Sequence, residues 1–328
     1  MDPIAALEEI AALLERERAS RYRAKAFRRA AAVLEGMASA ERDDLALVRR
    51  ASGIGDTTFT VIEQARSGRV PDYLAELRGS APPPASALRR RLRGDLHSHS
   101  EWSDGATPVL AMSDAARALG HEYLALTDHS PRLRVAHGLS AERLEEQLAH
   151  LAGLDTGPLR LLSGIEVDVL EDGALDQTDE LLDRLDVVVA SAHSKLRLPS
   201  REMTARLVAA ASDPRTDVLG HVTGRLVSGE RGTRPPSTFD ARAVFRACAD
   251  HSTAVEINAR PEREDPPDEL IALALEEGCL FSIDSDAHAP GQLGLLDYGA
   301  ERAERLGVPE ERIVTTWPVE RLLEWTRG

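Results

Sequence analysis

Histidine and carboxylate residues that could bind metal recur through the C-terminal two-thirds of the sequence. The segment DLHSHS places His97 and His99 two residues apart. Because side chains alternate along an extended strand, both imidazoles point to the same face. Later segments each add a histidine, an acidic residue or both: Asp104 in EWSDG, Asp128 and His129 in LTDHS, Glu166 in SGIEVD, His193 in SAHS, His221 in LGHVTG, and Asp284, Asp286 and His288 in IDSDAH.

These residues follow short hydrophobic runs that predict β-strands. The predicted strands lie around 95–97, 123–127, 159–167, 186–190, 217–219, 254–257 and 280–283. Stretches with helical periodicity separate them, at 107–119, 140–152, 200–211, 239–250 and 267–277. Such regular alternation predicts a parallel (β/α) barrel, with a doubly wound open sheet as the alternative. No GxGxxG follows the first strand, which disfavours a dinucleotide-binding fold.

Barrel enzymes build their active sites at the carboxyl ends of the strands, where these histidines and acids fall. One histidine after a strand is most often a hydrogen-bonded loop residue, but six of the ten histidines are placed in this way. Imidazole together with carboxylate suits zinc, manganese or iron. The spacing therefore predicts a metal site, and it leaves Asp284 and Asp286 as rival ligands.

Composition restricts the class of protein. Of the 328 residues, 42% are hydrophobic and 29% are charged, which is ordinary for a globular chain with a core. No apolar run approaches the ~20 residues that span a bilayer. Two cysteines, Cys248 and Cys279, cannot form a disulfide framework, and the acidic amphipathic N-terminus is unlike a secretory signal. We expect a cytoplasmic globular protein with no membrane association and no obligate protein partner.

The N-terminal region differs in charge and texture. Residues 1–93 contain 17 basic and 13 acidic side chains, whereas the remainder contains 23 and 42. Helical periodicity covers 4–18 and 24–36, and a Gly53-Ile54-Gly55 turn separates two short helical stretches. Residues 79–93, rich in Pro, Ser, Ala and Arg, predict a linker. The local basic excess permits a nucleic-acid contact, although a solvated helix face is the commoner reading of such a run.

Two classes of metal-dependent barrel share this outline, the amidohydrolases and the polymerase and histidinol phosphatase (PHP) domain. Glu166 on the third strand and the DxH at the end favour the second class. The segments DLHSHSEWSDG, LALTDHS, AHGLS, SGIEVDVLEDGALD, VVVASAHS, LGHVTGRL, AVEINARPER and SIDSDAH closely resemble the PHP domain of bacterial family X DNA polymerases. Residues 1–78, through RYRAKAFRRAA and SGIGDTTFTVIEQARSGRVPDYLAEL, more weakly resemble the helix-hairpin-helix domain of that family.

The resemblance implies a distorted, TIM-like seven-stranded (β/α) barrel over 94–328, a linker at 79–93 and an all-α helix-hairpin-helix domain over 1–78. It implies three divalent ions, zinc, manganese or iron, held by nine ligands: His97, His99, Asp104, His129, Glu166, His193, His221, Asp286 and His288. In this scheme Glu166 bridges two ions. His97, His99 and Asp286 complete the first set of ligands, His193 and His221 the second, and Asp104, His129 and His288 form the third.

Roles in substrate binding and catalysis follow from the same resemblance and from charge. We assign catalysis to Glu166 and Asp286 together with Arg225, and substrate binding to Lys195, Arg225 and His137. Arginine and lysine near the metals could clamp a phosphate. The candidate DNA contacts are Gly53, Gly55, Arg21, Arg23, Arg28 and Arg29, because backbone N–H groups and basic side chains bind phosphate.

The sequence departs from the polymerases in one respect. The polymerase palm would lie between the two regions, where only residues 79–93 are present, so we expect no nucleotide transfer. The hairpin region also lacks the lysine that a Schiff-base lyase requires.

The predicted activity is phosphoester hydrolysis by metal-activated water at nucleic-acid 3′ ends, as a 3′–5′ exonuclease or a 3′-phosphatase. The alternatives are a small-molecule phosphatase resembling histidinol phosphatase, an amidohydrolase-type enzyme, and a DNA-binding module without activity.

Overall fold

The computed structural model describes residues 1–16, 21–79, 86–228 and 232–327. The chain divides into two compact units, Met1–Pro84 and Ala85–Gly328. No helix within the described ranges combines the length and apolar character that crossing a bilayer requires.

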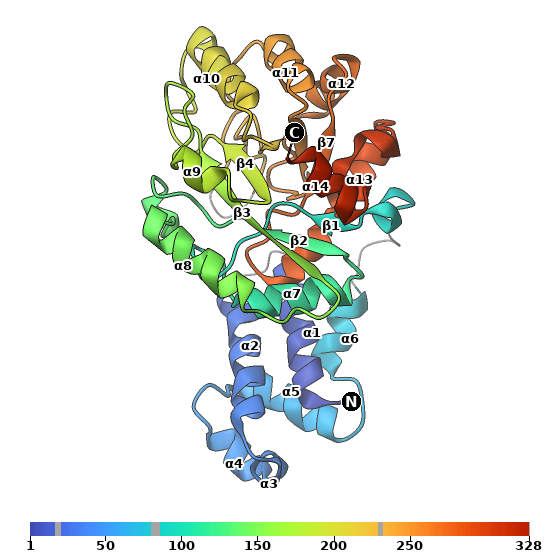
Figure 1. The fold of residues 1–328 in the computed structure, drawn as a ribbon. Helices are drawn as coiled ribbons and strands as arrows, with labels where there is room; N and C mark the ends of the chain where they lie inside the picture. The colour runs from blue at the N-terminus through green and yellow to red at the C-terminus, as the bar shows by residue number, and fades with distance from the viewer. Residues whose placement is uncertain (17–20, 80–85, 229–231, 328) are drawn as a thin grey trace. The chain divides into compact units, whose positions relative to one another are not determined.

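The N-terminal unit is helical in its described part (Figure 1). Its helices are α1 (Pro3–Arg16), α2 (Arg21–Gly36), α3 (Ser39–Asp43), α4 (Leu45–Arg50), α5 (Asp56–Arg66) and α6 (Asp72–Gly79). Leu7, Ile10 and Leu14 recur at helical spacing along α1 and are buried against α2 and α5. The predicted Gly53-Ile54-Gly55 turn connects α4 to α5.

The second unit is built on a single parallel sheet whose strands follow chain order. The strands are β1 (Gly94–Asp95), β2 (Tyr123–Leu126), β3 (Arg160–Asp168), β4 (Val187–Ser191), β5 (Val218–Leu219), β6 (Ala254–Asn258) and β7 (Phe281–Asp284). A parallel bridge between Ser98 and Ala287, and a bond from the His99 N–H to the Ala287 carbonyl (2.8 Å), connect the two outer strands. The sheet is therefore a nearly closed seven-stranded barrel, and the predicted fold class is confirmed.

Helices surround this sheet (Figure 1). They are α7 (Val109–Ala118), α8 (Ala141–Ala152), α9 (Asp179–Leu182), α10 (Ser200–Ser212), α11 (Ala241–Asp250), α12 (Asp268–Glu276), α13 (Leu296–Arg305) and α14 (Val319–Trp325). Helix α7 packs on β2, α8 on β3, α10 on β5, α11 on β6 and α13 on β7. Short 3₁₀ turns lie at Leu88–Arg91, Arg134–Ala136, Pro290–Leu295, Glu310–Arg312 and Val314–Thr316.

Alternation along the strands separates the barrel interior from the helix-facing side. On β3, Leu162 packs in the interior cluster, whereas Ile165 and Val167 pack in a second cluster with residues of α8–α10 and their loops. Glu166 shares the parity of Leu162, so its side chain enters the barrel. On β6, Ala254 is likewise interior, which places Glu256 on the same side.

Part of the predicted linker packs with the second unit. Residues 80–85 lie outside the described residues. Leu88 and Leu92 are buried in a core cluster of the second unit, and Arg89 pairs with Asp297 at 3.0 Å. The segment after 85 contributes apolar side chains to that core, a contribution that its arginine-rich composition conceals.

Candidate metal centre

The proposed metal ligands form a cluster around the carboxylate of Glu166. Its carboxylate is almost completely buried, and each oxygen faces a different set of imidazoles. Oε1 lies 2.8 Å from His221 Nε2 and 3.2 Å from His193 Nε2. Oε2 lies 3.3 Å from His97 Nε2, 3.6 Å from His99 Nε2 and 2.8 Å from His129 Nδ1. A carboxylate that faces two sets of ligands in this way has the geometry that a bridge between two ions requires.

A second group forms around Asp104, which comes from the loop after β1. Asp104 Oδ1 lies 3.4 Å from His129 Nε2 and 3.2 Å from His288 Nε2. His99 completes a group of four residues whose ligand atoms are all within 4.8 Å of one another. Asp286 joins the cluster through Oδ1, 3.5 Å from His99 Nε2. The structure thus brings all nine proposed ligands together.

The unpaired atoms of the cluster match a metal-binding function. Among the described residues, His97 Nε2, both ring nitrogens of His99, and Asp104 Oδ1 are buried without a hydrogen-bond partner. Buried polar atoms are nearly always satisfied, because leaving one unpaired costs free energy. Imidazole nitrogens and carboxylate oxygens that lack partners and converge are the ligands that zinc, manganese and iron take. The residues present therefore fit divalent ions.

Three carboxylates, those of Asp104, Glu166 and Asp286, dominate the electrostatics of the cluster. Burial alone would raise the pKa of Glu166, but His193, His97 and His129 hold it well below its usual range. Burial would also lower the pKa of His129, but Glu166 and Asp104 raise it to about 10. The carboxylates are consequently ionised and available as ligands at neutral pH.

Further side chains orient the ligands. Asp168, two residues after Glu166 on β3, lies 3.3 Å from His193 Nδ1. The Asp286 carbonyl lies 2.9 Å from His288 Nδ1, so the Nδ1–H donates there and Nε2 faces Asp104. Asp286 has a φ of +50°, a left-handed conformation that is rare outside glycine and is found at strained functional sites.

The structure separates the rival aspartates. Asp286 is in the cluster, whereas Asp284 Oδ1 accepts a bond from the Leu96 N–H (2.9 Å) beneath it. Burial and the neighbouring Asp95 raise the pKa of Asp284 well above its usual value. Asp284 thus connects the outer strands β1 and β7 of the barrel.

In the described structure the predicted substrate-binding residues have other partners than the proposed ligands. The Arg225 Nε donates to the Arg263 carbonyl at 3.1 Å, and its Nη2 donates to the Glu264 carbonyl. Its guanidinium therefore braces the loop after β6, and the structure does not bring it to the metal ligands. Lys195 is exposed and lies 3.8 Å from Glu171. His137 is exposed at the end of a 3₁₀ turn, with a φ of +56°.

Two arginines that sequence reasoning missed do reach the cluster. Arg263 Nε donates to Asp286 Oδ2 at 3.0 Å, and Arg260 Nη1 donates to the Asp286 carbonyl at 2.6 Å. Both are in the AVEINARPER segment, which marked the sixth strand but to which no site residue was assigned. Polar residues alternating at the end of β6 were the available signal.

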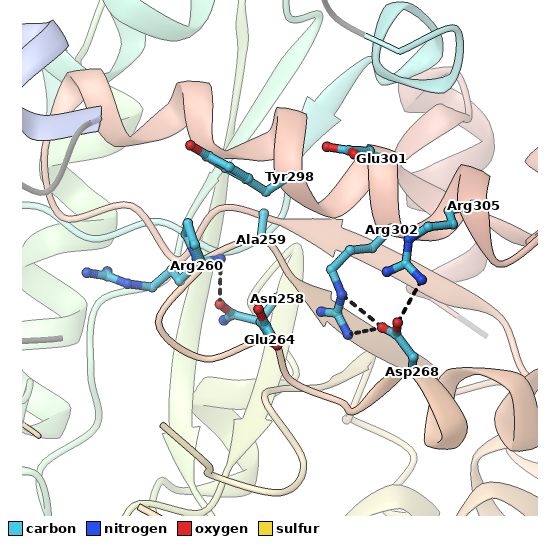
Figure 2. Close-up of a pocket in the computed structure, with 10 residues that line it drawn as sticks. Asn258, Ala259, Arg260, Glu264, Asp268, Tyr298, Glu301, Arg302 and Arg305 are labelled. Atoms are coloured by element: carbon cyan, nitrogen blue, oxygen red, sulfur yellow. Dashed lines mark hydrogen bonds and ion pairs between the residues drawn. The ribbon is translucent and has the colours of Figure 1, made fainter. Parts of the chain in front are cut away.

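Arg260 also borders a separate cavity of about 180 Å³ behind this loop. Figure 2 shows its guanidinium pointing away from Arg302 and Arg305, which both pair with Asp268. Arg260 itself pairs with Glu262 at 2.9 Å, so all three arginines that line this cavity are engaged within the protein.

Some of the proposed DNA-contacting residues of the N-terminal unit are bonded within the protein, whereas others are exposed. Arg28 forms an ion pair with Glu15 at 2.8 Å, and Arg23 donates to the Tyr73 hydroxyl. Arg29 is exposed beside Gly53, where an added Cβ would lie 2.8 Å from Arg29 Nε. The Gly55 N–H is taken by Thr58 Oγ1 (2.9 Å), so it caps α5. The side chain of Arg21 lies outside the described residues.

The fold and the ligands together define a metal-dependent hydrolase built on a parallel barrel. A family model for the PHP domain matches residues 95–260. The chain is 30% identical, over 236 residues, to a protein of Vibrio parahaemolyticus named as a probable phosphatase, and the match covers 68% of this chain and 88% of that protein. The chain belongs to the PHP family. This membership confirms the predicted class of metal-dependent phosphoester hydrolase.

Two further similarities concern proteins with named activities. The DNA polymerase/3′-5′ exonuclease PolX of Bacillus subtilis is 37% identical over 217 residues, which cover 66% of this chain and 37% of PolX. The chain therefore spans little more than a third of the length of that relative. A solved histidinol phosphate phosphatase from Lactococcus lactis, complexed with zinc, histidinol and phosphate, is 18% identical with a TM-score of 0.47, covering 66% of this chain and 92% of that one.

Proposed function

We propose that this protein hydrolyses phosphoesters at nucleic-acid 3′ ends, as a 3′–5′ exonuclease or a 3′-phosphatase. The proposal includes three divalent ions, zinc, manganese or iron, held by the nine clustered residues. The observation that carries it is the recessed position of these residues. The side chains of His97, His99 and Glu166 are at most 1% exposed, whereas those of Asp104, His193 and His288 are 20%, 14% and 11% exposed.

A recessed site selects for a phosphate that can enter it. The terminal phosphoester of a strand can move into such a depression, but an internal linkage of a duplex is held on both sides by the rest of the helix. The same geometry admits a small phosphomonoester. Nucleic acid is favoured over a small molecule by the similarity to PolX, whose name includes a 3′-5′ exonuclease.

The N-terminal unit supports the same substrate class. Tyr22, Lys25 and Arg29 are exposed and lie at helical spacing on one face of α2, with Arg29 beside the Gly53 turn. Basic side chains contact phosphates, and exposed aromatic rings stack on bases. We therefore propose this face, and not Arg28, as the nucleic-acid contact of the helix-hairpin-helix unit.

Bound divalent ions would supply positive charge for the phosphoryl oxygens and would lower the pKa of a water towards ~7. The chain contributes the orientation of that chemistry. Glu166 separates the two sets of imidazoles by facing each with a different oxygen. Arg263 holds Asp286 at the edge of the cluster. Lys195 is exposed two residues after His193, where it can contact the backbone of an entering strand.

A small-molecule phosphatase is the second candidate. The similarity to a probable phosphatase covers 88% of that relative, and residues 94–328 carry a charge of −19, with 23 basic and 42 acidic residues. An acidic barrel repels a polyanion unless another part of the chain holds it.

A direct comparison of substrates tests the proposal. Purified protein loaded with Mn²⁺ or Zn²⁺ is assayed on 3′-labelled single-stranded DNA, on the same strand with a 3′-phosphate, on histidinol phosphate and on a generic phosphomonoester. We expect the DNA substrates to be hydrolysed with the highest kcat/KM. Glu166→Gln, purified in parallel, controls for contaminating nuclease. Preferential hydrolysis of histidinol phosphate would replace the proposal with the second candidate.

A further inference from the structure

We infer that Glu256 is a positioning residue that sets two histidines of the metal centre, His97 and His221. Glu256 is on β6, its side chain is completely buried, and it enters the barrel interior. The strand predicted at 254–257 includes Glu256, but this strand supplies none of the nine proposed ligands. The inference rests on the metal centre and is independent of which phosphoester is the substrate.

One oxygen of Glu256 fixes the tautomer of His97. Glu256 Oε1 lies 2.6 Å from His97 Nδ1. Because a carboxylate oxygen accepts, Nδ1 points its proton at Glu256, and Nε2 is the ring nitrogen left to bind an ion. That Nε2 is buried without a hydrogen-bond partner among the described residues, and it lies 3.3 Å from Glu166 Oε2. Glu256 therefore orients the His97 ring so that Nε2 faces the metal centre.

The other oxygen holds the backbone of His221. Glu256 Oε2 accepts from the His221 N–H at 2.5 Å. His221 has a φ of +21°, a left-handed conformation that a non-glycine residue adopts only when its surroundings impose it. The bond to Glu256 is one such constraint, and it directs the imidazole so that Nε2 lies 2.8 Å from Glu166 Oε1.

Asn258 extends the arrangement to the last strand. Its Nδ2 donates to Glu256 Oε2 at 3.1 Å and lies 3.2 Å from Asp286 Oδ2. Glu256 thereby connects proposed ligands that follow β1, β5 and β7, through the imidazole of His97, the backbone N–H of His221 and the amide of Asn258. Such outer carboxylates hold metal-bound histidines, and their loss weakens metal affinity by about 10–100-fold.

The barrel offers a matched control. Asp217 is also a buried carboxylate, and it accepts the Val188 N–H at 2.7 Å at the opposite end of the strands. Its contacts do not include a proposed ligand. Asp217→Asn consequently alters a buried carboxyl group of the same barrel without altering the orientation of the cluster.

Glu256→Gln in the full-length chain tests the inference. The amide keeps the shape, but only its carbonyl oxygen can accept. One of the two donors, His97 Nδ1–H or the His221 N–H, then faces an NH₂ group. We expect Mn²⁺ and Zn²⁺ affinity, measured by chelator competition, to fall about 10–100-fold, the scale of such losses elsewhere. In zinc-loaded protein with ¹⁵N-labelled histidine, the Nδ1–H resonance of His97 should shift and exchange faster with water, because its carboxylate acceptor is lost. Asp217→Asn should change neither readout.

Glu256→Asp gives a second measurement if the glutamine variant does not fold. The shorter side chain keeps the charge but cannot reach both donors, so the same two readouts should move in the same direction. An unchanged His97 Nδ1–H resonance, together with metal affinity within twofold of wild type in a folded variant, would overturn the inference. Substrate preference does not enter either measurement, so the inference and the proposed activity fail separately.

Discussion

At the scale of single residues, the two oxygens of Glu166 divide five imidazoles between them, three on Oε2 and two on Oε1. A neutral amide at this position would place an NH₂ against at least one set of ring nitrogens. The charge of Glu166 is thus more important than its shape, which makes an isosteric substitution informative.

Glu166→Gln is expected to reduce phosphoester hydrolysis by ~100-fold or more, the scale seen when one charge-stabilising group is removed from an active site. Secondary structure should be retained because the amide occupies the same volume. Steady-state kinetics and circular dichroism on the same preparation measure both effects. Full activity in the folded variant would show that Glu166 does not bridge two ions.

The choice between the two aspartates yields a second prediction. Asp286→Asn should lower bound metal, because Asp286 Oδ1 lies among the ligands. Asp284→Asn should retain it, because an amide oxygen can still accept the Leu96 N–H. Metal content by mass spectrometry after dialysis distinguishes the two variants. Loss of metal in Asp284→Asn alone would reverse the assignment.

The residues that could be predicted from the sequence are those whose type and position both signal the function. Histidines and acids just beyond hydrophobic runs meet that condition, and the structure gathers all nine in one place. Arg260 and Arg263 could not be separated from Arg225 in this way. All three are arginines in loops after strands, and only the path of the loop after β6 decides which guanidinium reaches Asp286.

At the scale of elements, strand existence was predictable but strand length was not. Strand β1 ends at Asp95, before the expected His97. Beyond Asp95, side chains accept backbone N–H groups that a neighbouring strand would otherwise accept. The Leu96 N–H donates to Asp284 and the Ser98 N–H donates to Thr127 Oγ1. Such bonds join residues that are 188 and 29 positions apart, so no local pattern reveals them.

The opposite end of β2 contains a buried histidine with a consequence for stability. His121 lies 3.5 Å from Arg89, and burial together with that cation lowers its pKa from 6.5 to about 3. The unfolded chain therefore binds a proton below pH ~6.5 that the folded chain does not accept. Above that pH, His121 does not change the free energy of unfolding with pH. As the pH falls from there towards 3, His121 lowers the free energy of unfolding increasingly.

His121→Gln should remove this contribution. Between pH 7.5 and 5.0 the wild type should lose about 2 kcal/mol more unfolding free energy than the variant, since one pKa unit corresponds to ~1.4 kcal/mol. Urea unfolding at both pH values gives the difference, and the titrating groups common to both proteins cancel. Parallel pH dependence in the two proteins would mean that His121 titrates normally in the fold.

At the scale of the whole molecule, the two units differ in charge, since Met1–Pro84 contains 13 basic and 13 acidic side chains whereas Ala85–Gly328 contains 27 and 42. Residues 1–93 carry a net charge of +4 and the remainder carries −19. The sequence predicted the basic excess before residue 94 and the Gly53-Ile54-Gly55 turn between two helices, but it treated four arginines as equivalent. The structure distinguishes them by their partners: Glu15 neutralises Arg28, whereas Lys25 and Arg29 are exposed on one face of α2 with Tyr22.

That distinction leads to a prediction about DNA binding by the full-length chain. Lys25→Glu and Arg29→Glu should each weaken binding to single-stranded DNA and reduce the salt dependence of log K by about 1, because each lost phosphate contact removes roughly one released counterion.

Arg69→Glu is the matched control, because it makes the same charge change on the α5–α6 connection. Hydrolysis of a small phosphomonoester should be unchanged in all three variants, since the nine proposed ligands lie after residue 94. Fluorescence anisotropy at several salt concentrations measures affinity and slope together. If all three variants lose affinity equally, the effect is one of net charge, and the face of α2 is not a specific contact.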